Sequence, residues 1–353
     1  MAQSLSRKLL VGTVGLTLGL GCFWLATRNV ELSEAKSIFE SSDWRWIVVG
    51  ICVFGTDIII RIVRWRVILS HRRKIDFIQV ARGLLVGYAV NILLPARLGE
   101  LFRADYTARL SGVSRSTILG SIFIERVVDL FTVMSLFGIG LVLSGIKNSF
   151  IDNVVITGAI MLAVGVLLIC LTVMRTTRRE IRGLLVNITT KLLSDAVAKR
   201  AMRMISSFAS LLRIVPTNRF LLVLALTVPI WALEGLSVFS ICRAIGLNLT
   251  LSPSLVLLGG ASLGTLFPTA PGFVGSYQFA FVVVLRNFSI PDSLALVAAT
   301  GTQIYLMGVY ALFGLSVWSF APPTAQRSGK YDTQPETKVS GAGSRYSWLK
   351  DHV

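Results

Sequence analysis

Long uninterrupted stretches of apolar residues dominate the chain, and short charged segments separate them. Six of these stretches reach about 18 residues, enough to cross a bilayer as helices. They lie at about 9–26, 45–70, 116–145, 152–174, 220–246 and 293–320. Because the runs are continuous rather than alternating, they do not suit a β-barrel. The pattern predicts an all-α polytopic membrane protein whose first span is a retained signal anchor rather than a cleaved signal peptide.

A further apolar stretch, at about 77–94, stops at Pro95 and is followed by a charged, helix-compatible segment at 97–110. Both flanks of this unit are basic, so both ends are expected on the cytoplasmic side. A re-entrant hairpin that turns at Pro95 and Gly99 fits this pattern. The alternative is a full span followed by an external loop. Irregular backbone at membrane depth must be buried in protein or line a wet cavity.

A second break lies in the apolar run that begins near 254. Its middle contains Pro268, Pro271, Gly272 and Gly275. The bare glycine backbone could approach a ligand closely, or these residues could simply form a tight turn. Either way, two apolar halves around a Pro/Gly break predict another broken-helix hairpin.

The order of spans and breaks is the same in both halves of the chain. Each half, at about 1–148 and 149–320, contains span, span, hairpin and span. Three crossings per half invert the second half relative to the first. Inverted repeats with broken helices at corresponding positions are typical of secondary transporters, whose substrates bind where the broken helices meet. We therefore expect one transmembrane domain over 1–320 that is built as an inverted repeat.

Charges between the spans orient the chain. Residues 27–43 hold two basic and four acidic side chains and should be external, whereas 175–219 hold ten Lys or Arg and two acids and should be cytoplasmic. Helically spaced apolar residues in 175–219 indicate basic amphipathic helices in the inner interface, with a solvated helical loop as the alternative. The polar tail 321–353 is expected to be disordered. Both termini are thus predicted to be cytoplasmic, in a multi-pass protein of the inner cell membrane.

Composition agrees with a membrane domain and argues against several functions. Hydrophobic residues make up 54% of the chain, charged residues 15%, and the mean hydropathy is +0.72. The net charge of +17 suits cytoplasmic loops and anionic headgroups better than nucleic acid, because no basic domain has interleaved aromatic residues. The two histidines and four scattered cysteines suggest no metal or Ser-His-Asp site, and no ATP-binding motif occurs. We expect no cofactor and no enzymatic activity; the oligomeric state is open.

The third predicted span carries charges in its interior. Its sequence ERVVD places Glu125 and Asp129 on one helix face, with Arg126 able to pair with Asp129 at i, i+3. Ionisable residues in a membrane are costly and usually face the bundle interior or a polar cavity. They could form a polar pathway or a lock between conformations, or a structural ion-pair network that holds the helices together.

Three charged residues follow Pro95 at a spacing of three. Arg97, Glu100 and Arg103 therefore share one broad helix face. Two guanidiniums around one carboxylate leave a surplus positive charge, and arginine matches phosphate as a planar fork. A half-helix N-terminus after Pro95 would add N–H groups and a positive dipole end. We expect a phosphate headgroup site; the alternative is interfacial arginines touching bulk anionic lipid.

Charged residues in other spans add to these candidates. Arg61 and Arg64 could join the phosphate site, or extend to the membrane surface along their own aliphatic stems. Glu234 lies in the fifth span near Pro229, which interrupts that span, and is a candidate counter-ion.

Three motifs occur in a fixed order along the chain. They are N-x-x-x-P-x-R-x-G-E-x-x-R from Asn91 to Arg103, E-R-x-x-D from Glu125 to Asp129, and P-x-x-P-G-x-x-G from Pro268 to Gly275. Together, over about 5–320, they resemble the transmembrane-region family of lysylphosphatidylglycerol synthases. The late motif of that family commonly has a glutamate three residues past the last glycine, where this chain has Gln278. A role of that acid in proton coupling or ion pairing is therefore in doubt here.

The resemblance implies a flippase that moves a phosphate-bearing lipid between leaflets: a phospholipid, an aminoacyl lipid, a glycolipid or a polyprenyl-phosphate carrier. Asn91 and the arginines would then contact its headgroup. Bifunctional members also carry a soluble synthase domain, and only a short tail follows 320 here, so we expect no headgroup synthesis. Two alternatives are a membrane-embedded glycosyl or aminoacyl transferase with Glu125 or Asp129 as base, and a non-catalytic partner of a glycosyltransferase. A glycosyltransferase or lipid-modifying enzyme is also the expected protein partner of the flippase.

Overall fold

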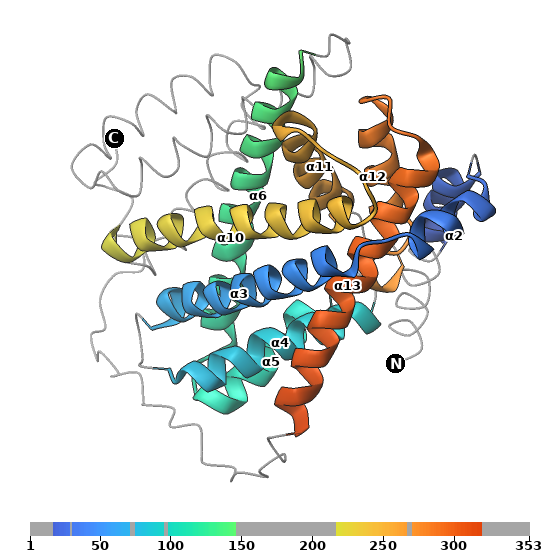
Figure 1. The fold of residues 1–353 in the computed structure, drawn as a ribbon. Coiled ribbons are helices and arrows are strands. Elements are labelled where there is room, and N and C mark those ends of the chain that lie inside the picture. Colours follow the sequence, from blue (N-terminus) through green and yellow to red (C-terminus); the bar gives the residue numbers. More distant parts are fainter. Residues whose placement is uncertain are drawn as a thin grey trace, which may run out of the picture.

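The computed structural model describes residues 17–28, 30–70, 75–94, 98–145, 217–266 and 270–319. These residues form helices and no strand (Figure 1). An apolar helix, Thr17–Thr27, comes first. The helices that follow are α2 (Leu32–Glu40), α3 (Trp44–Leu69), α4 (Phe77–Leu93), α5 (Gly99–Ser111), α6 (Arg115–Ser144), α10 (Thr217–Ala244), α11 (Leu251–Gly264), the 3₁₀ turn η1 (Pro271–Phe273), α12 (Ser276–Arg286) and α13 (Asp292–Ser319).

Four of the described helices, α3, α6, α10 and α13, are long and apolar enough to cross a membrane. They coincide with the second, third, fifth and last predicted spans, and confirm a polytopic all-α protein. Of the first predicted span, the described part is the short helix Thr17–Thr27, and the fourth, 152–174, lies outside the described residues. The segments 175–216 and 321–353 lie outside them as well. The predicted interruption at Pro229 is wrong, because α10 continues through this proline.

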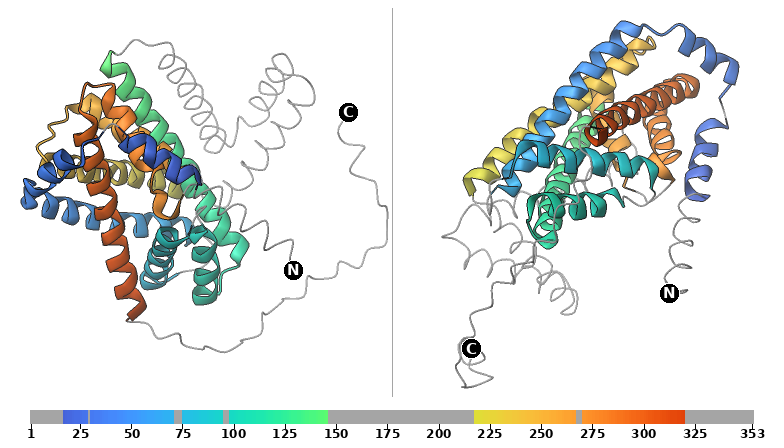
Figure 2. Two further views of the ribbon diagram at one scale, coloured as in Figure 1. Left: turned by 90° about the vertical axis from the view of Figure 1, so that its right-hand side faces the viewer. Right: turned by 90° about the horizontal axis from the view of Figure 1, so that it is seen from below.

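Helices α3 and α10 lie side by side along most of their lengths (Figures 1 and 2). Their contacts run in opposite directions along the two sequences. The Asp43 amide donates to the Ala244 carbonyl at 2.7 Å, and Arg219 at the other end of α10 donates to the Ser70 hydroxyl at 3.2 Å. The two helices are therefore antiparallel, as the predicted inversion of the two halves requires.

The first predicted break is a helical hairpin. The Gln79 side chain at the start of α4 donates to the Leu110 carbonyl at the end of α5 at 3.1 Å, so these two ends lie side by side. At the turn between the helices, the Gly99 amide donates to Asn91 Oδ1 at 2.8 Å. A Cβ on Gly99 would lie 2.2 Å from the Gly87 carbonyl oxygen, so only glycine permits this approach. Helix α5 thus returns alongside α4, as the hairpin interpretation predicts.

The second predicted break is also a helical hairpin. Helices α11 and α12 pack against each other, and a Cβ on Gly264 would lie 2.6 Å from the Ala280 Cβ. Between them, Gly272, Phe273 and Gly275 adopt φ of 64°, 62° and 91°. A left-handed phenylalanine is uncommon and costs conformational energy, so surrounding packing must impose this turn.

In each half, the last long helix packs against the hairpin of the other half. Helix α6 of the first half packs on α11 of the second, and α13 of the second packs on α4 of the first. The Ser252 hydroxyl of α11 donates to the Gly140 carbonyl of α6 at 3.0 Å. Each of these long helices therefore braces the hairpin of the other half, and the inverted repeat stays a prediction. The proposed boundary near 148 lies outside the described residues.

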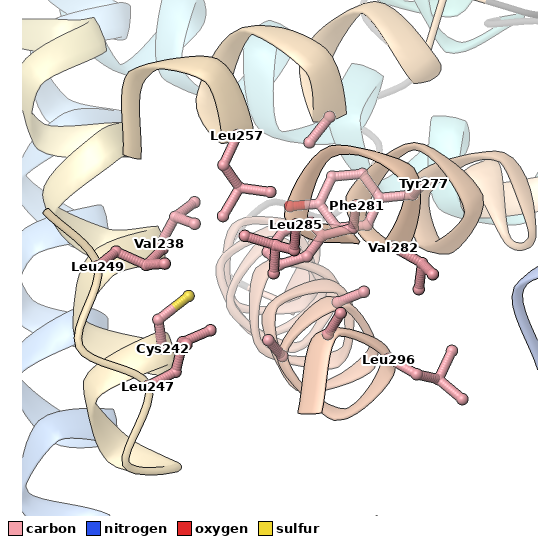
Figure 3. Packing of buried hydrophobic residues seen from close by; sticks show 14 of the residues in the cluster. Val238, Cys242, Leu247, Leu249, Leu257, Tyr277, Phe281, Val282, Leu285 and Leu296 are labelled. Carbon is pink, nitrogen blue, oxygen red and sulfur yellow. The ribbon is translucent and has the colours of Figure 1, made fainter. Parts of the chain in front are cut away.

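Charged side chains lie inside the helix bundle and large apolar side chains lie on its surface, the reverse of a soluble protein. Large apolar side chains such as Val48, Ile59 and Val142 are exposed on the long helices, whereas Asp57, Arg64 and Glu125 are fully buried. Between them lie apolar clusters. One of them joins α10, α11, α12 and α13 around Phe281 and Leu285 (Figure 3). Since burying charge is costly, an apolar exterior around a charged interior indicates lipid outside and partnered charges within.

Candidate functional site

Helix α3 brings three charged side chains to the centre of the molecule. Asp57, Arg61 and Arg64 follow one another at i, i+4 and i+7, so they share one face of α3. Arg61 Nε donates to Asp57 Oδ2 at 2.6 Å, and its Nη2 donates to Glu234 of α10. Arg61 is buried, with an exposed fraction of 5%. Its predicted extension to the membrane surface is wrong, because its partners are carboxylates within the bundle.

Arg64 joins α3 to α6 and α10. It donates to both carboxylate oxygens of Asp129, at 2.6 and 3.0 Å, and to the Thr227 hydroxyl at 3.1 Å. The Trp231 indole also donates to Asp129, at 3.3 Å. Such a two-pronged pair is strong in a buried setting. Arg64 is fully buried, so it too does not reach the surface.

Arg103 joins α5 to α6. It donates to both oxygens of Glu125, at 2.8 and 3.4 Å. Its guanidinium stacks on the Trp65 ring, 3.6 Å from the ring centre, and Trp65 donates to the Ser121 hydroxyl at 3.0 Å. The first hairpin is therefore held to α3 and α6 by one buried side chain.

Arg126 lies beside Glu100 rather than beside its predicted partner. Its Nε is 3.1 Å from Glu100 Oε1, and its Nη2 is 3.7 Å from Glu125 Oε1. Asp129 is instead paired with Arg64. The Arg126 and Glu100 side chains keep exposed fractions of 30% and 25%. This ion pair is therefore accessible, unlike the buried pairs behind it.

A cavity of about 450 Å³ lies where the two breaks and the α3–α10 pair meet. Its charged lining is Arg61, Glu100, Arg126, Asp129 and Glu234. The end of α4 contributes Tyr88 and Asn91, and the second break contributes Gly272 and Phe273. Leucines and valines of α6 and α11 cover another part of the wall, among them Leu130, Val133, Leu257 and Leu258. The cavity thus combines ionised groups with an apolar surface.

Two glutamines hold the second break. Gln278 Oε1 accepts from the Gly275 amide at 2.8 Å, and its amide nitrogen donates to Gln303 of α13. Gln303 in turn donates to the Gly272 carbonyl at 2.7 Å. Both side chains are buried, at 2% and 6% exposure. The pair joins α12 to α13, as Arg103 and Glu125 join α5 to α6, but without charge.

The predicted phosphate contacts do not all face open space. Arg64 and Arg103 direct their donors to carboxylates, and Asn91 satisfies the Gly99 amide at the start of α5. Of the predicted arginines, Arg61 lines the cavity together with Arg126. Three predicted positions, Pro95, Arg97 and Pro268, lie outside the described residues. Among the described residues, no group of His, Cys, Asp or Glu could hold a metal ion.

Several central residues were missed by the sequence analysis. Asp57 carries a readable signal, because it precedes Arg61 by four positions inside an apolar run. Trp65 and Gln303 carry none, since an aromatic residue or an amide in an apolar helix is commonly a core residue. Their roles depend on partners 38 and 25 positions away, Arg103 and Gln278.

Comparison with known proteins gives relatives of the same kind. The sequence model of the lysylphosphatidylglycerol synthase TM region matches residues 12–314. Glycosyltransferase AglD of Haloferax volcanii is 25% identical over 81% of this chain, which spans 50% of that protein's length. UPF0104 membrane protein MJ1078 of Methanocaldococcus jannaschii is 28% identical over 58% of this chain and 82% of its own. No solved structure matches the chain.

Proposed function

Because the chain belongs to the lysylphosphatidylglycerol synthase transmembrane-region family, we propose that it is a membrane flippase for a phosphate-bearing lipid. Its substrate would be a phospholipid, an aminoacyl lipid, a glycolipid or a polyprenyl-phosphate carrier. The headgroup binds in the central cavity while the acyl or prenyl chains stay in the bilayer.

The observation that carries this proposal is the mixed lining of the cavity at the meeting point of the two breaks. Arg61 and Arg126 supply guanidinium donors on one part of the wall, and Leu257 and Leu258 of α11 supply an apolar part. A lipid presents the same two chemistries on one molecule. A volume of about 450 Å³ lies within the usual range for small-ligand sites, so a headgroup fits without the lipid tails.

Arg126 is the main phosphate contact in this proposal. Its side chain is 30% exposed and its carboxylate partner, Glu100, lies at the start of α5, next to the break. Phosphate can replace the Glu100 carboxylate on the guanidinium. The planar carboxylate and the tetrahedral phosphate are both oxyanions that accept two N–H donors. This exchange would separate α5 from α6 at the cavity and so couple headgroup binding to movement of the first hairpin.

A transferase is the second candidate, because the matched relative of Haloferax volcanii is named a glycosyltransferase. In that case Glu125 or Asp129 would act as base. Their geometry supports this less well, since arginine side chains hold both oxygens of each carboxylate. A base needs a lone pair within reach of the substrate proton. A glycosyltransferase or other lipid-modifying enzyme remains the proposed partner that supplies or uses the flipped lipid.

Reconstitution tests the flippase against the transferase. Purified protein in proteoliposomes should accelerate leaflet exchange of fluorescent phosphatidylglycerol or of a polyprenyl phosphate, relative to protein-free vesicles. Product formation from a sugar nucleotide or sugar-phosphate donor, without leaflet exchange, would support the transferase. Neither activity, together with co-purification of a glycosyltransferase, would support a non-catalytic partner.

A further inference from the structure

Arg61 has two carboxylate partners, whereas each of its three arginine neighbours can be matched with one carboxylate. Those three pairs are Arg64 with Asp129 at 2.6 Å, Arg103 with Glu125 at 2.8 Å and Arg126 with Glu100 at 3.1 Å. Arg61 instead forms ion pairs with two carboxylates, those of Asp57 and Glu234. The excess negative charge among these described groups is therefore located at Arg61.

The surroundings do not offset this excess. The charged and titratable groups that act on Arg61 and Glu234 from the neighbouring helices are Asp129 of α6, Tyr88 of α4, Tyr277 of α12 and Tyr305 and Tyr310 of α13, with Arg64 on α3 itself. Arg64 is already held by Asp129. Asp57 Oδ1 is buried without a hydrogen-bond partner among the described residues. Two ionised carboxylates around one guanidinium are costly in such a site, and a bound proton removes the cost.

We propose that Glu234 is a proton-binding site and that its proton is the ion coupled to lipid movement. This proposal rests on the proposed flippase function. Of the two carboxylates, Asp57 is fully buried, whereas the Glu234 side chain is 20% exposed and lines the cavity. Protons from the cavity therefore reach Glu234. One proton converts its carboxylate to a carboxylic acid, and the same proton returns to water when the acid ionises.

Protonation changes what Arg61 can bind. Arg61 Nε stays on Asp57, while Nη2 loses an ionised acceptor and becomes available to the cavity. A headgroup phosphate then competes for that donor with a neutral acid instead of a carboxylate. By linkage, phosphate binding must raise the proton affinity of Glu234 by the same factor. Proton and phosphate are thus taken up together and released together.

Infrared spectroscopy of the purified protein tests the proton site without any transport. A pH titration should show the C=O band of a protonated carboxylic acid, and Glu234→Gln should remove it. Glu234→Asp should keep a shifted band. The matched control is Glu100→Gln, which also alters a cavity carboxylate but one with its own arginine. An unchanged band in Glu234→Gln would overturn the assignment.

Transport under a pH gradient tests the coupling. Vesicles of phosphatidylethanolamine and phosphatidylglycerol carry labelled phosphatidylglycerol, and a gradient of about one pH unit should shift its leaflet distribution by up to about tenfold for one proton per lipid. Glu234→Gln should lose this dependence on the gradient, and Asp105→Asn, which alters an exposed carboxylate outside the cavity, should retain it. If the unmodified protein exchanges the labelled lipid but its leaflet distribution does not depend on the gradient, the coupling is overturned while the flippase activity is supported. The infrared band without exchange of any lipid would refute the flippase, and the coupling with it.

Discussion

Arg64 of α3 and Asp129 of α6 form a two-pronged pair, with hydrogen bonds of 2.6 and 3.0 Å, although 65 positions separate them in the chain. Asp129 lines the cavity and Arg64 lies behind it, and Trp231 and Thr227 of α10 complete the hydrogen bonds of the pair. It thereby ties the helix that carries ERVVD to the central antiparallel pair. For this residue pair, the structural ion-pair alternative of the sequence analysis describes the geometry better than the polar pathway.

Breaking this pair should destabilise the protein strongly. Asp129→Asn breaks the two-pronged pair and leaves the buried Arg64 with Glu125, 3.5 Å away, as its remaining carboxylate neighbour; breaking a buried pair typically costs about 3–5 kcal/mol. The apparent Tm of the purified protein in one detergent measures the effect. Asp105→Asn is the control, because Asp105 pairs with Arg109 at the surface and such pairs contribute below about 1 kcal/mol. Equal Tm values for the two variants would contradict the structural role.

The first hairpin should depend on glycine at position 99. In Gly99→Ala the new Cβ would lie 2.2 Å from the Gly87 carbonyl oxygen, a backbone atom that no rotamer change can move. Overpacking of this kind costs about 1–3 kcal/mol. We expect a lower Tm and slower leaflet exchange. Gly55→Ala, where a Cβ meets no atom within 4 Å, should be neutral or stabilising; the same loss in both variants would contradict the close approach.

The second hairpin should depend on Gln303. Gln303→Leu leaves the Gly272 carbonyl and the Gln278 amide without their partner, at a cost of about 1–3 kcal/mol. Amide hydrogen exchange in the described residues 270–278 should become faster, while exchange in α4 and α5 stays the same. Ser254→Ala, which removes a hydroxyl that donates to the Thr250 carbonyl at the start of α11, serves as the control. Unchanged exchange at 270–278 in Gln303→Leu would show that other contacts hold the turn.

Apolar length and turn residues were sufficient to predict the four long described helices and both hairpins, whereas helix α2 was not predicted. Apolar length located α3, α6, α10 and α13, and proline with glycine located both hairpins. These signals are local, because length and backbone freedom are properties of the segment itself. Pro229 shows the limit of such a signal, since α10 continues as a helix through it.

The site was predictable in its residue types but not in its pairings. The charges of ERVVD were expected to be buried, and Glu125 and Asp129 are, whereas Arg126 is partly exposed; Asp129 pairs with Arg64 and Arg126 with Glu100. Ion pairs between helices depend on rotation and register, which sequence spacing within one helix does not contain. The phosphate candidates therefore shift from Arg64 and Arg103, which are held by carboxylates, toward Arg61 and Arg126 on the cavity wall.

Cysteine labelling tests the orientation of the first hairpin in the membrane. In a background without native cysteines, Asp76→Cys at the start of α4 and Ser114→Cys after α5 should react from the same, cytoplasmic side. Ser41→Cys after α2 should react from the opposite side. All three positions are exposed in the structure. Labelling of positions 76 and 114 from opposite faces would contradict the re-entrant hairpin, and reversed labelling of all three would contradict the orientation.

The central claim is that the cavity between the two breaks carries the lipid headgroup, and leaflet exchange in proteoliposomes measures it. The comparison is between Arg126→Ala, which removes a cavity guanidinium, and Arg109→Ala, which removes an exposed arginine outside the cavity. Loss of one charge-assisted contact of about 1.5–3 kcal/mol predicts roughly a tenfold to hundredfold slower exchange of labelled phosphatidylglycerol for Arg126→Ala. Arg109→Ala should match the unmodified protein. Equal exchange by both variants, with both folded, would contradict the claim.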